Sequence, residues 1–152
     1  MLFDYNNVPK GAKDLKVRNY SDIAGMHCEE VDTSSKTLYK DMHKLGWDMV
    51  QTCIKNDGIG LAAPQIGVFK NVFIMIGFVK PDIWSFDGNF HMIINPTLKV
   101  EKSWGETPTL FSEGCLSVPG ETYGIQRMYN CSAQYYYFDA KNTLKKSIDK
   151  LS

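Results

Sequence analysis

The strongest constraint on the fold is a change of hydrophobic period after residue 58. Residues 36–55 carry apolar side chains at intervals of three and four, which is the spacing of one face of a helix. The Thr-Ser-Ser sequence at residues 33–35 offers N-cap residues for this helix, and Asn56-Asp57-Gly58 ends it. The apolar positions of the stripe are Leu38, Met42, Leu45, Met49, Val50, Cys53 and Ile54.

Beyond this helix the pattern is that of strands. Val, Ile and Phe dominate residues 71–79, which favours a buried strand, whereas Pro81, Asp87 and Gly88 indicate a loop over residues 80–89. The first thirty residues are irregular, with a turn at residues 9–11. Further strands are expected at residues 91–94, 97–101 and 126–139, with a bend at Asn95-Pro96, a hairpin turn at 139–142 and its returning arm at 143–148. One helix followed by several strands predicts an α+β fold with a largely antiparallel sheet.

The length and charge of the chain narrow its class. Its 152 residues fit a single domain, since domains commonly hold about 100–200 residues. Seventeen basic and seventeen acidic residues cancel, which disfavours a nucleic-acid-binding surface. The longest apolar run is residues 72–79, far short of the roughly 20 residues that span a bilayer, and the first residues do not resemble a signal peptide. We therefore expect one cytoplasmic domain over residues 1–152, with no direct contact to nucleic acid or membrane.

Four cysteines are widely spaced along the chain and form no Cys-x-x-Cys pair. A structural zinc cluster or a thioredoxin-like motif is therefore not indicated. In a reducing compartment the default interpretation of such residues is a set of buried free thiols. They are Cys28, Cys53, Cys115 and Cys131.

Residues 58–67, Gly-Ile-Gly-Leu-Ala-Ala-Pro-Gln-Ile-Gly, form the most informative stretch. Its glycines and alanines permit close approach of other atoms to the backbone, and Pro64 fixes the backbone just before Gln65. Gln65 is a lone amide among small apolar residues, so its side chain either satisfies nearby backbone groups or points into a site. A phosphate-binding loop is disfavoured, because the Lys-Ser/Thr pair is absent and Pro64 would interrupt the helix that should follow.

A second segment, residues 113–120, has the sequence Glu-Gly-Cys-Leu-Ser-Val-Pro-Gly. Here Cys115 stands between a glycine and a short apolar stretch. On these residues alone, three interpretations of its thiol are open: a ligand of a transition metal, a nucleophile, or a small side chain packed in the interior.

Together, the two segments resemble the first and second signature motifs of peptide deformylases. Gly-x-Gly-Leu-Ala-Ala-Pro-Gln and Glu-Gly-Cys-Leu-Ser are both matched without a substitution, and the resemblance covers about residues 34–142. Asn95-Pro96, the Val-Pro-Gly sequence at residues 118–120 and Arg127 agree with the layout of the family. The resemblance implies a deformylase-like α+β fold. It also implies a metal-dependent hydrolase that removes the formyl group from the N-terminal formyl-methionine of nascent polypeptides, at the ribosome.

The resemblance also implies roles for the residues that could carry the chemistry. In the family an Fe(II) ion, which Zn, Ni or Co can replace, is held by one cysteine and two histidines, and Cys115 matches the cysteine. Such an ion lowers the pKa of a bound water, which attacks the formyl carbon. Gln65 matches the glutamine whose amide donates to the developing oxyanion, and the backbone N–H of Leu116 would donate to the same oxygen.

Other positions are assigned to binding and support on the same resemblance. Gly60 matches a glycine whose backbone contacts the substrate, and its neighbour Ile59 belongs to the same substrate-binding segment. Glu113 and Arg127 are expected to form a supporting ion pair behind the metal-binding loop. This pairing is a hypothesis, which Arg127→Ala would refute if neither stability nor metal affinity changed.

The third motif of the family, His-Glu-x-x-Asp-His on a helix, does not occur in the sequence. In the family its histidines supply two metal ligands and its glutamate acts as general acid and base. The three histidines of this chain, His27, His43 and His91, all precede Cys115 and have no partner at ligand spacing. Residues 143–152 correspond to the approach to the third-motif helix, so the expectation is a deformylase sequence that is truncated before it.

This expectation has consequences for activity and stability. With one of about three ligands, the chain alone should bind no metal tightly and have no useful deformylase activity. Without the helix, apolar surface of the sheet should be exposed, which predicts aggregation, weak stability or a second polypeptide that supplies the helix. The alternative function is a non-catalytic protein whose Gly60, Gln65 and Leu116 recognise N-terminal methionine without hydrolysis.

Overall fold

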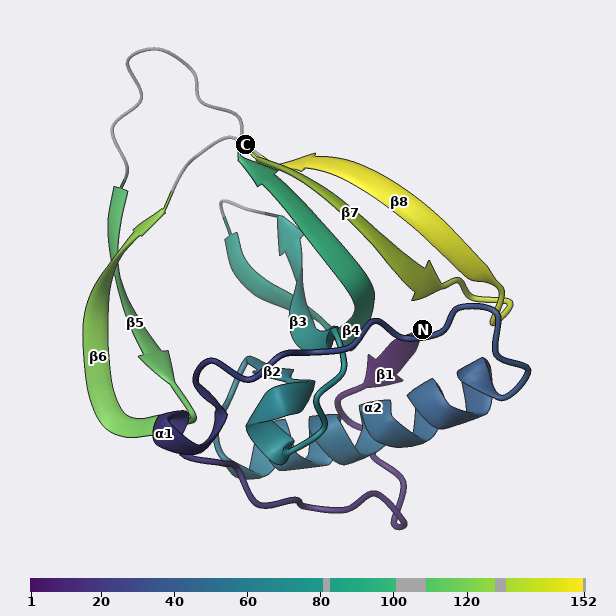
Figure 1. The fold of residues 1–152 in the computed structure, drawn as a ribbon, viewed down its shortest axis with the longest axis horizontal. Helices are drawn as coiled ribbons and strands as arrows, with labels where there is room; N and C mark the ends of the chain where they lie inside the picture. The colour runs from purple at the N-terminus through teal and green to yellow at the C-terminus, as the bar shows by residue number, and fades with distance from the viewer. Residues whose placement is uncertain (81–82, 101–108, 128–130, 152) are drawn as a thin grey trace.

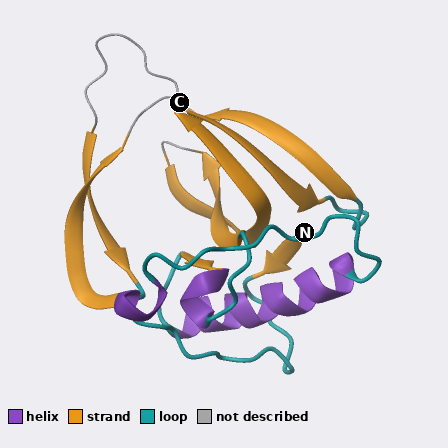
Figure 2. Ribbon diagram, in the orientation of Figure 1, coloured by secondary structure: helices purple, strands orange, loops and turns teal. Residues whose placement is uncertain are grey.

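A long helix lies beneath an antiparallel sheet in the computed structural model, and a separate hairpin arches away to one side (Figures 1 and 2). The structure describes residues 1–80, 83–100, 109–127 and 131–151. The arrangement confirms the predicted α+β class. The elements are β1 (Leu2–Asp4), α1 (Tyr20–Ile23), α2 (Leu38–Lys55), β2 (Gly60–Ala62), the 3₁₀ helix η1 (Ala63–Ile66), β3 (Val72–Lys80), β4 (Ile83–Val100), β5 (Thr109–Cys115), β6 (Val118–Arg127), β7 (Cys131–Phe138) and β8 (Leu144–Leu151).

The central strand of the main sheet is β4. Within the described residues, six strands form this sheet in the order β2-β3-β4-β7-β8, with β1 also paired to β4, and every pairing is antiparallel. Three residues of β4 pair on both edges: Phe90 and His91 pair with β3 and β1, and Ile94 pairs with β3 and β7. The strands β5 and β6 pair only with each other in the described part of the chain, as a second, two-stranded sheet.

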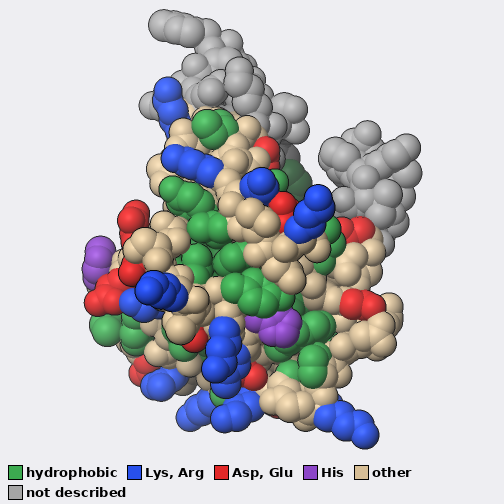
Figure 3. All heavy atoms as spheres, turned by 90° about the vertical axis from the view of Figure 1, so that its right-hand side faces the viewer, with side chains coloured by type: hydrophobic (Ala, Val, Ile, Leu, Met, Phe, Trp, Pro, Cys, Tyr) green, Lys and Arg blue, Asp and Glu red, His purple; other side chains and the backbone are tan. Residues whose placement is uncertain are grey.

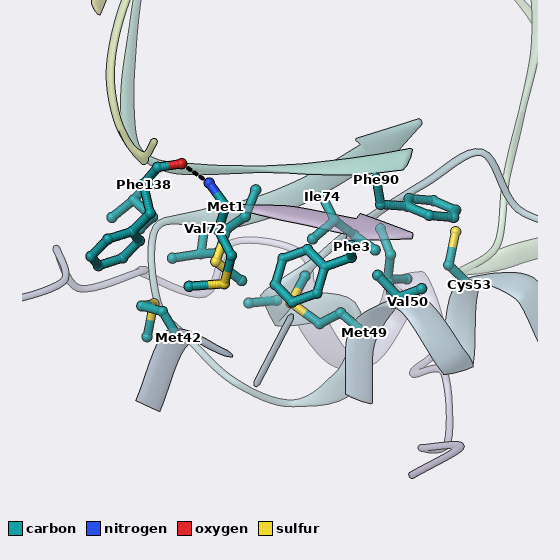
Figure 4. Packing of buried hydrophobic residues seen from close by; sticks show 14 of the residues in the cluster. Met1, Phe3, Met42, Met49, Val50, Cys53, Val72, Ile74, Phe90 and Phe138 are labelled. Atoms are coloured by element: carbon teal, nitrogen blue, oxygen red, sulfur yellow. Dashed lines mark hydrogen bonds between the residues drawn. The ribbon is translucent and has the colours of Figure 1, made fainter. Parts of the chain in front are cut away.

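The core lies between α2 and the main sheet (Figure 4). Apolar side chains of α2 at three- and four-residue intervals face alternate residues of β3 and β4, so the helical and the strand periods meet on one surface. The amino group of Met1 donates a hydrogen bond to the backbone oxygen of Phe138 at the margin of this core. The buried core residues of these elements are Leu38, Met42, Met49, Val50, Cys53, Val72, Ile74, Ile76, Phe90, Met92 and Ile94.

The side chain of Phe3 connects β1 to the helix. It is fully buried and meets the ring of Trp47 edge to face, at 5.0 Å between ring centroids. A Cβ atom added at Gly46 of α2 would lie only 2.1 Å from the Phe3 ring. Glycine in a helix interior costs about 1 kcal/mol relative to alanine, and at this position it makes room for an aromatic side chain.

Several predictions from local pattern are confirmed. The predicted helix at residues 36–55 is α2, and it ends at Lys55 as expected. The strand predicted at residues 71–79 is β3. The turn at residues 9–11 is present, with the Ala12 N–H donating to the Pro9 oxygen, and the turn at residues 139–142 joins β7 to β8.

Other predictions were wrong, in each case where pairing with a distant segment determines the structure. The N-cap position of the helix is Thr37, whose side chain makes no capping hydrogen bond, and not one of residues 33–35. Residues 83–89, predicted as loop, belong to β4, since β3 offers them partners; residues 81–82 lie outside the described part. The two strands predicted at 91–94 and 97–101 are one strand with an irregular register between Ile94 and Thr97, where Asn95 has a φ of 49°. Residue 101 of this prediction is not among the described residues.

The predicted strand region 126–139 divides between two sheets. Its start belongs to β6 and its main part is β7, while residues 128–130 fall outside the described ranges. The first thirty residues are also less irregular than predicted, because they contain β1 and α1. Among the described residues, no helix has the length and apolar character needed to cross a bilayer.

Part of the apolar surface is not covered by other elements. On the β5–β6 hairpin, Leu110, Phe111 and Tyr123 are 67%, 47% and 46% exposed. On the side of the molecule where β7, β8 and the first turns of α2 lie, apolar side chains gather at the centre with Lys and Arg around them (Figure 3). A hollow of about 360 Å³ is lined by residues of β1, β4 and β7, among them Leu2 and Phe138.

The contact of Phe3 with α2 generates a stability prediction with a neighbouring control. Phe3→Ala should lower the free energy of unfolding in urea by about 3–5 kcal/mol, because it leaves a cavity beside Gly46. Leu2→Ala, at a side chain that is 57% exposed, should change it by less than about 0.5 kcal/mol. Equal effects of the two substitutions would mean that β1 does not pack as described.

Candidate active site

Residues 58–67 leave the end of α2 through a short series of tight turns. Asp57 has a φ of 55°, and the Gly58 N–H donates to the Cys53 oxygen at 2.9 Å, which closes the helix. Strand β2 and the 3₁₀ helix η1 follow, with Pro64 in the first turn of η1, where its missing N–H costs nothing. Gly67 ends η1 in the left-handed conformation, at φ 81°. These turns and hydrogen bonds fix the backbone of residues 58–67, and with it the positions of their side chains.

Residues 113–120 form the closed end of the β5–β6 hairpin. Cys115 is the last residue of β5 and is paired with Val118, so Leu116 and Ser117 make a two-residue turn. The register shifts between Gly114 and Cys115, and this irregularity alters the direction of the strand just before the turn.

The side chain of Gln65 joins the two segments, which are 50 residues apart in sequence. Its Oε1 accepts a hydrogen bond from the Ala62 N–H at 2.8 Å. Its Nε2 lies 3.3 Å from the Ser117 Oγ and 3.8 Å from the Cys115 Sγ, and can donate to both. The sequence left open whether this amide satisfies nearby backbone or points into a site. In the structure it does both: Oε1 accepts from the backbone, and Nε2 faces the side chains of the second segment.

A second contact between the segments depends on glycine. A Cβ atom at Gly58 would lie 2.8 Å from Cδ1 of Leu116 and 2.9 Å from Sγ of Cys53. Because such distances are too short for carbon contacts, only glycine allows the Leu116 side chain to pack against the end of α2. The Leu116 side chain is half-buried against the core, which anchors the turn next to Cys115.

The two segments enclose an open cleft of about 820 Å³. Its walls come from the end of α2 and the start of β2 on one side, and from the turn and the first part of β6 on the other. The lining residues are Asn56, Asp57, Gly58, Ile59, Gly60, Gln65, Gly114, Cys115, Leu116, Val118, Pro119, Gly120, Glu121 and Thr122.

The thiols of the chain lie in different environments. Cys115 is exposed in the cleft, whereas Cys53 is fully buried beneath it. Burial raises the pKa of the Cys53 thiol to about 11, so this group stays neutral in the core. Cys28 and Cys131 are partly buried, and all four cysteines are free. The expectation of buried thiols therefore holds fully only for Cys53, and Cys115 is the thiol available to a ligand.

Glu113 and Arg127 form the ion pair that the sequence suggested. Arg127 Nε and Nη2 donate to the two carboxylate oxygens of Glu113 at 2.8 and 2.5 Å, across the β5–β6 hairpin. The hydrogen bond from Arg127 holds the pKa of Glu113 below its ordinary value of 4.5. The pair therefore adds stability above that pH, which is lost as the pH falls through the lowered pKa. Both side chains are more than a third exposed, so the contribution is small.

The residues at the cleft do not form a complete set of ligands for a metal ion. Among the described residues, no three His, Cys, Asp or Glu side chains are close enough to hold one, and Cys115 is the only such thiol in the lining. His43 accepts a hydrogen bond from Trp47 on α2, and His91 pairs with Asp87 at 2.7 Å in the main sheet. The described residues thus do not fit the metal that the resemblance implied.

The predicted site residues fall into two groups. Five of them line one cleft: Ile59, Gly60, Gln65, Cys115 and Leu116. Glu113 and Arg127 lie on the hairpin outside this lining.

Sequence reasoning missed Ser117, whose side chain is 4% exposed and faces Gln65, although it is the last residue of the second motif. It also missed the wall formed by residues 118–122. No pattern in that stretch indicated a binding surface, because only its pairing with β5 brings it to the cleft.

Comparison with known proteins agrees with this geometry. The family model of polypeptide deformylase matches residues 16–150. The peptide deformylase of Fusobacterium nucleatum is 35% identical over 115 residues, which cover 74% of this chain and 58% of that protein. The chain spans between 56% and 65% of the length of three curated relatives that it matches.

Solved structures give the same result. A probable peptide deformylase from Synechococcus phage S-SSM7 has a TM-score of 0.68 at 28% identity, over 89% of this chain and 83% of that one. A class I type b peptide deformylase from Acinetobacter baumannii, solved with Met-Ala-Ser bound, has a TM-score of 0.64 at 26% identity, over 90% of this chain and 83% of that one. The antiparallel α+β fold, the two motif segments facing one cleft and these matches together show that the chain belongs to the polypeptide deformylase family.

Proposed function

We propose that the cleft binds the formyl-methionyl end of a polypeptide, and that this chain provides the substrate-binding part of a deformylase active site. The observation that carries the proposal is the position of Gln65, whose amide donor lies beside Cys115 at the wall of an open cleft. The substrates would be nascent polypeptides that carry formyl-methionine, in the cytoplasm and at the ribosome.

Gln65 is suited to hold the formyl oxygen. The hydrogen bond from Ala62 to its Oε1 leaves Nε2 directed at Cys115 and Ser117 before any ligand arrives. A donor that already points into the site can exchange one of these long contacts for the formyl oxygen and stabilise developing charge there with little reorganisation. The backbone N–H of Leu116, in the turn next to Cys115, is the second donor in this proposal.

The edge of β2 is suited to hold the peptide backbone. Gly60 pairs with Met75 of β3 on one side, and no strand in the described part of the chain occupies the other side of β2. Free sheet edges bind extended peptides through main-chain hydrogen bonds. Ile59 and Gly60 both line the cleft, so a peptide on this edge would have its first residue near Gln65.

Hydrolysis needs groups that these residues do not supply. We propose that the family's metal, Fe(II) or else Zn, Ni or Co, is retained only when a helix with the His-Glu-x-x-Asp-His pattern joins these residues, for example from a second polypeptide. The exposed apolar side chains of the β5–β6 hairpin support this proposal. The alternative is a binding protein that recognises N-terminal methionine without hydrolysing the formyl group. It is favoured by the lack of further metal ligands near Cys115 among the described residues.

The role of the Gln65 donor is tested by Gln65→Glu. Glutamate keeps the oxygen that accepts from Ala62 but cannot donate to the formyl oxygen when ionised, so binding of formyl-Met-Ala-Ser should weaken by about tenfold. Isothermal titration calorimetry measures this, with Gln126→Glu on the exposed surface of β6 as the matched control. Equal affinities of wild type and Gln65→Glu would contradict the assignment.

Metal retention distinguishes the catalytic proposal from its alternative. Purified chain loaded with Fe(II) or Zn(II) should lose the metal on desalting and show no turnover of formyl-Met-Ala-Ser, because one thiol is too few ligands for a catalytic site. Adding a helical peptide with the His-Glu-x-x-Asp-His pattern should raise both metal content and turnover, and Cys115→Ser should abolish the gain. Robust turnover by the chain alone would refute this account, and binding that the helical peptide never converts to turnover would favour the binding protein.

A further inference from the structure

Two buried polar side chains of α2 hold an extended segment near the N-terminus, residues 13–20, which we call the strap. Asp48 Oδ1 accepts from the Lys13 N–H and Thr52 Oγ1 accepts from the Leu15 N–H, both at 2.8 Å. Asp48 is 6% exposed and Thr52 is fully buried. Buried polar groups in a helix interior need such partners. Here they include backbone N–H groups of a segment without regular structure until α1, and Asp48 Oδ2 also pairs with Lys44 Nζ at 2.9 Å.

The other end of the strap contacts both segments of the candidate site. The Arg18 N–H donates to the backbone oxygen of Gln65 at 2.7 Å, and the Tyr20 N–H donates to the backbone oxygen of Ser117 at 3.0 Å. A Cβ atom at Gly67 would lie 2.9 Å from the Arg18 guanidinium, so this side chain lies against the glycine that ends η1. The strap thus contacts Gln65 and Ser117, which are also joined directly by the hydrogen bond from Gln65 Nε2 to Ser117 Oγ.

We propose that Thr52 and Asp48 are positioning residues, which act through the strap to set the separation of Gln65 from Cys115 and Ser117. This inference rests on the proposed function of the cleft. Only three peptide units separate Leu15 from Arg18, and an extended residue spans at most about 3.3–3.6 Å, so a shift at Leu15 reaches Arg18. Thr52 Oγ1 itself donates to the Asp48 backbone oxygen at 2.7 Å, which orients its acceptor side toward the strap.

A pair of substitutions at Thr52 separates this role from packing. Thr52→Val keeps the shape of the side chain and removes the hydroxyl, whereas Thr52→Ser keeps the hydroxyl and removes a methyl group. Val50→Ala, in the same helix and fully buried, is the control for loss of core stability. Three properties are measured for each variant: amide hydrogen exchange of Arg18 and Tyr20, the NMR signal of the Gln65 side-chain amide, and the affinity for formyl-Met-Ala-Ser.

Thr52→Val should accelerate exchange at Arg18 and Tyr20 by about tenfold, shift the Gln65 amide signal and weaken peptide binding by about fivefold or more, as expected for loss of one buried hydrogen bond. Thr52→Ser should leave all three properties close to those of the wild type. Val50→Ala should lower the melting temperature without changing them. Unchanged exchange in Thr52→Val, or changed exchange with unchanged affinity, would overturn the proposal. Failure of the wild type to bind the peptide would refute the proposed function instead, and the exchange rates with the Gln65 signal would then decide the positioning role alone.

Discussion

The side chain of Gln65 is the contact on which the arrangement of this site depends. One end is fixed by the backbone of its own segment, and the other reaches the thiol and the hydroxyl of a hairpin 50 residues away. A single amide with both ends engaged has little freedom to rotate, so the donor direction is set before any ligand enters. Two nearby glycines also help to hold this arrangement, since Gly58 leaves room for the Leu116 side chain and Gly67 leaves room for that of Arg18.

The sequence predicted the local elements well and the distant pairings poorly. Helix α2 and strand β3 follow from periodicity because their signals lie within one continuous stretch. Strand β1 was missed because three residues carry no period, and its stability comes from the burial of Phe3 against Gly46. Residues 83–89 contain turn-forming residues, yet they extend β4 because β3 pairs with them.

For the site, the sequence motifs named the side chains but not the backbone that supports them. Gln65 and Cys115 were predicted to act together through the family resemblance, and the structure brings them to one cleft. The strap could not be predicted, because it contacts Gln65 and Ser117 through backbone groups that any residue type provides. The buried Asp48 and Thr52 were the available signal, since polar residues on the core side of a helix require partners.

The central claim is that the cleft receives the formyl-methionyl end with its formyl oxygen on the Gln65 amide. A titration of ¹⁵N-labelled chain with formyl-Met-Ala-Ser, followed by NMR, tests it most directly. The account predicts that the side-chain amide of Gln65 and the backbone amide of Leu116 shift together with one saturation curve, while amides of the β7–β8 hairpin stay in place. Saturable binding that leaves both the Gln65 and the Leu116 signals unchanged would contradict it.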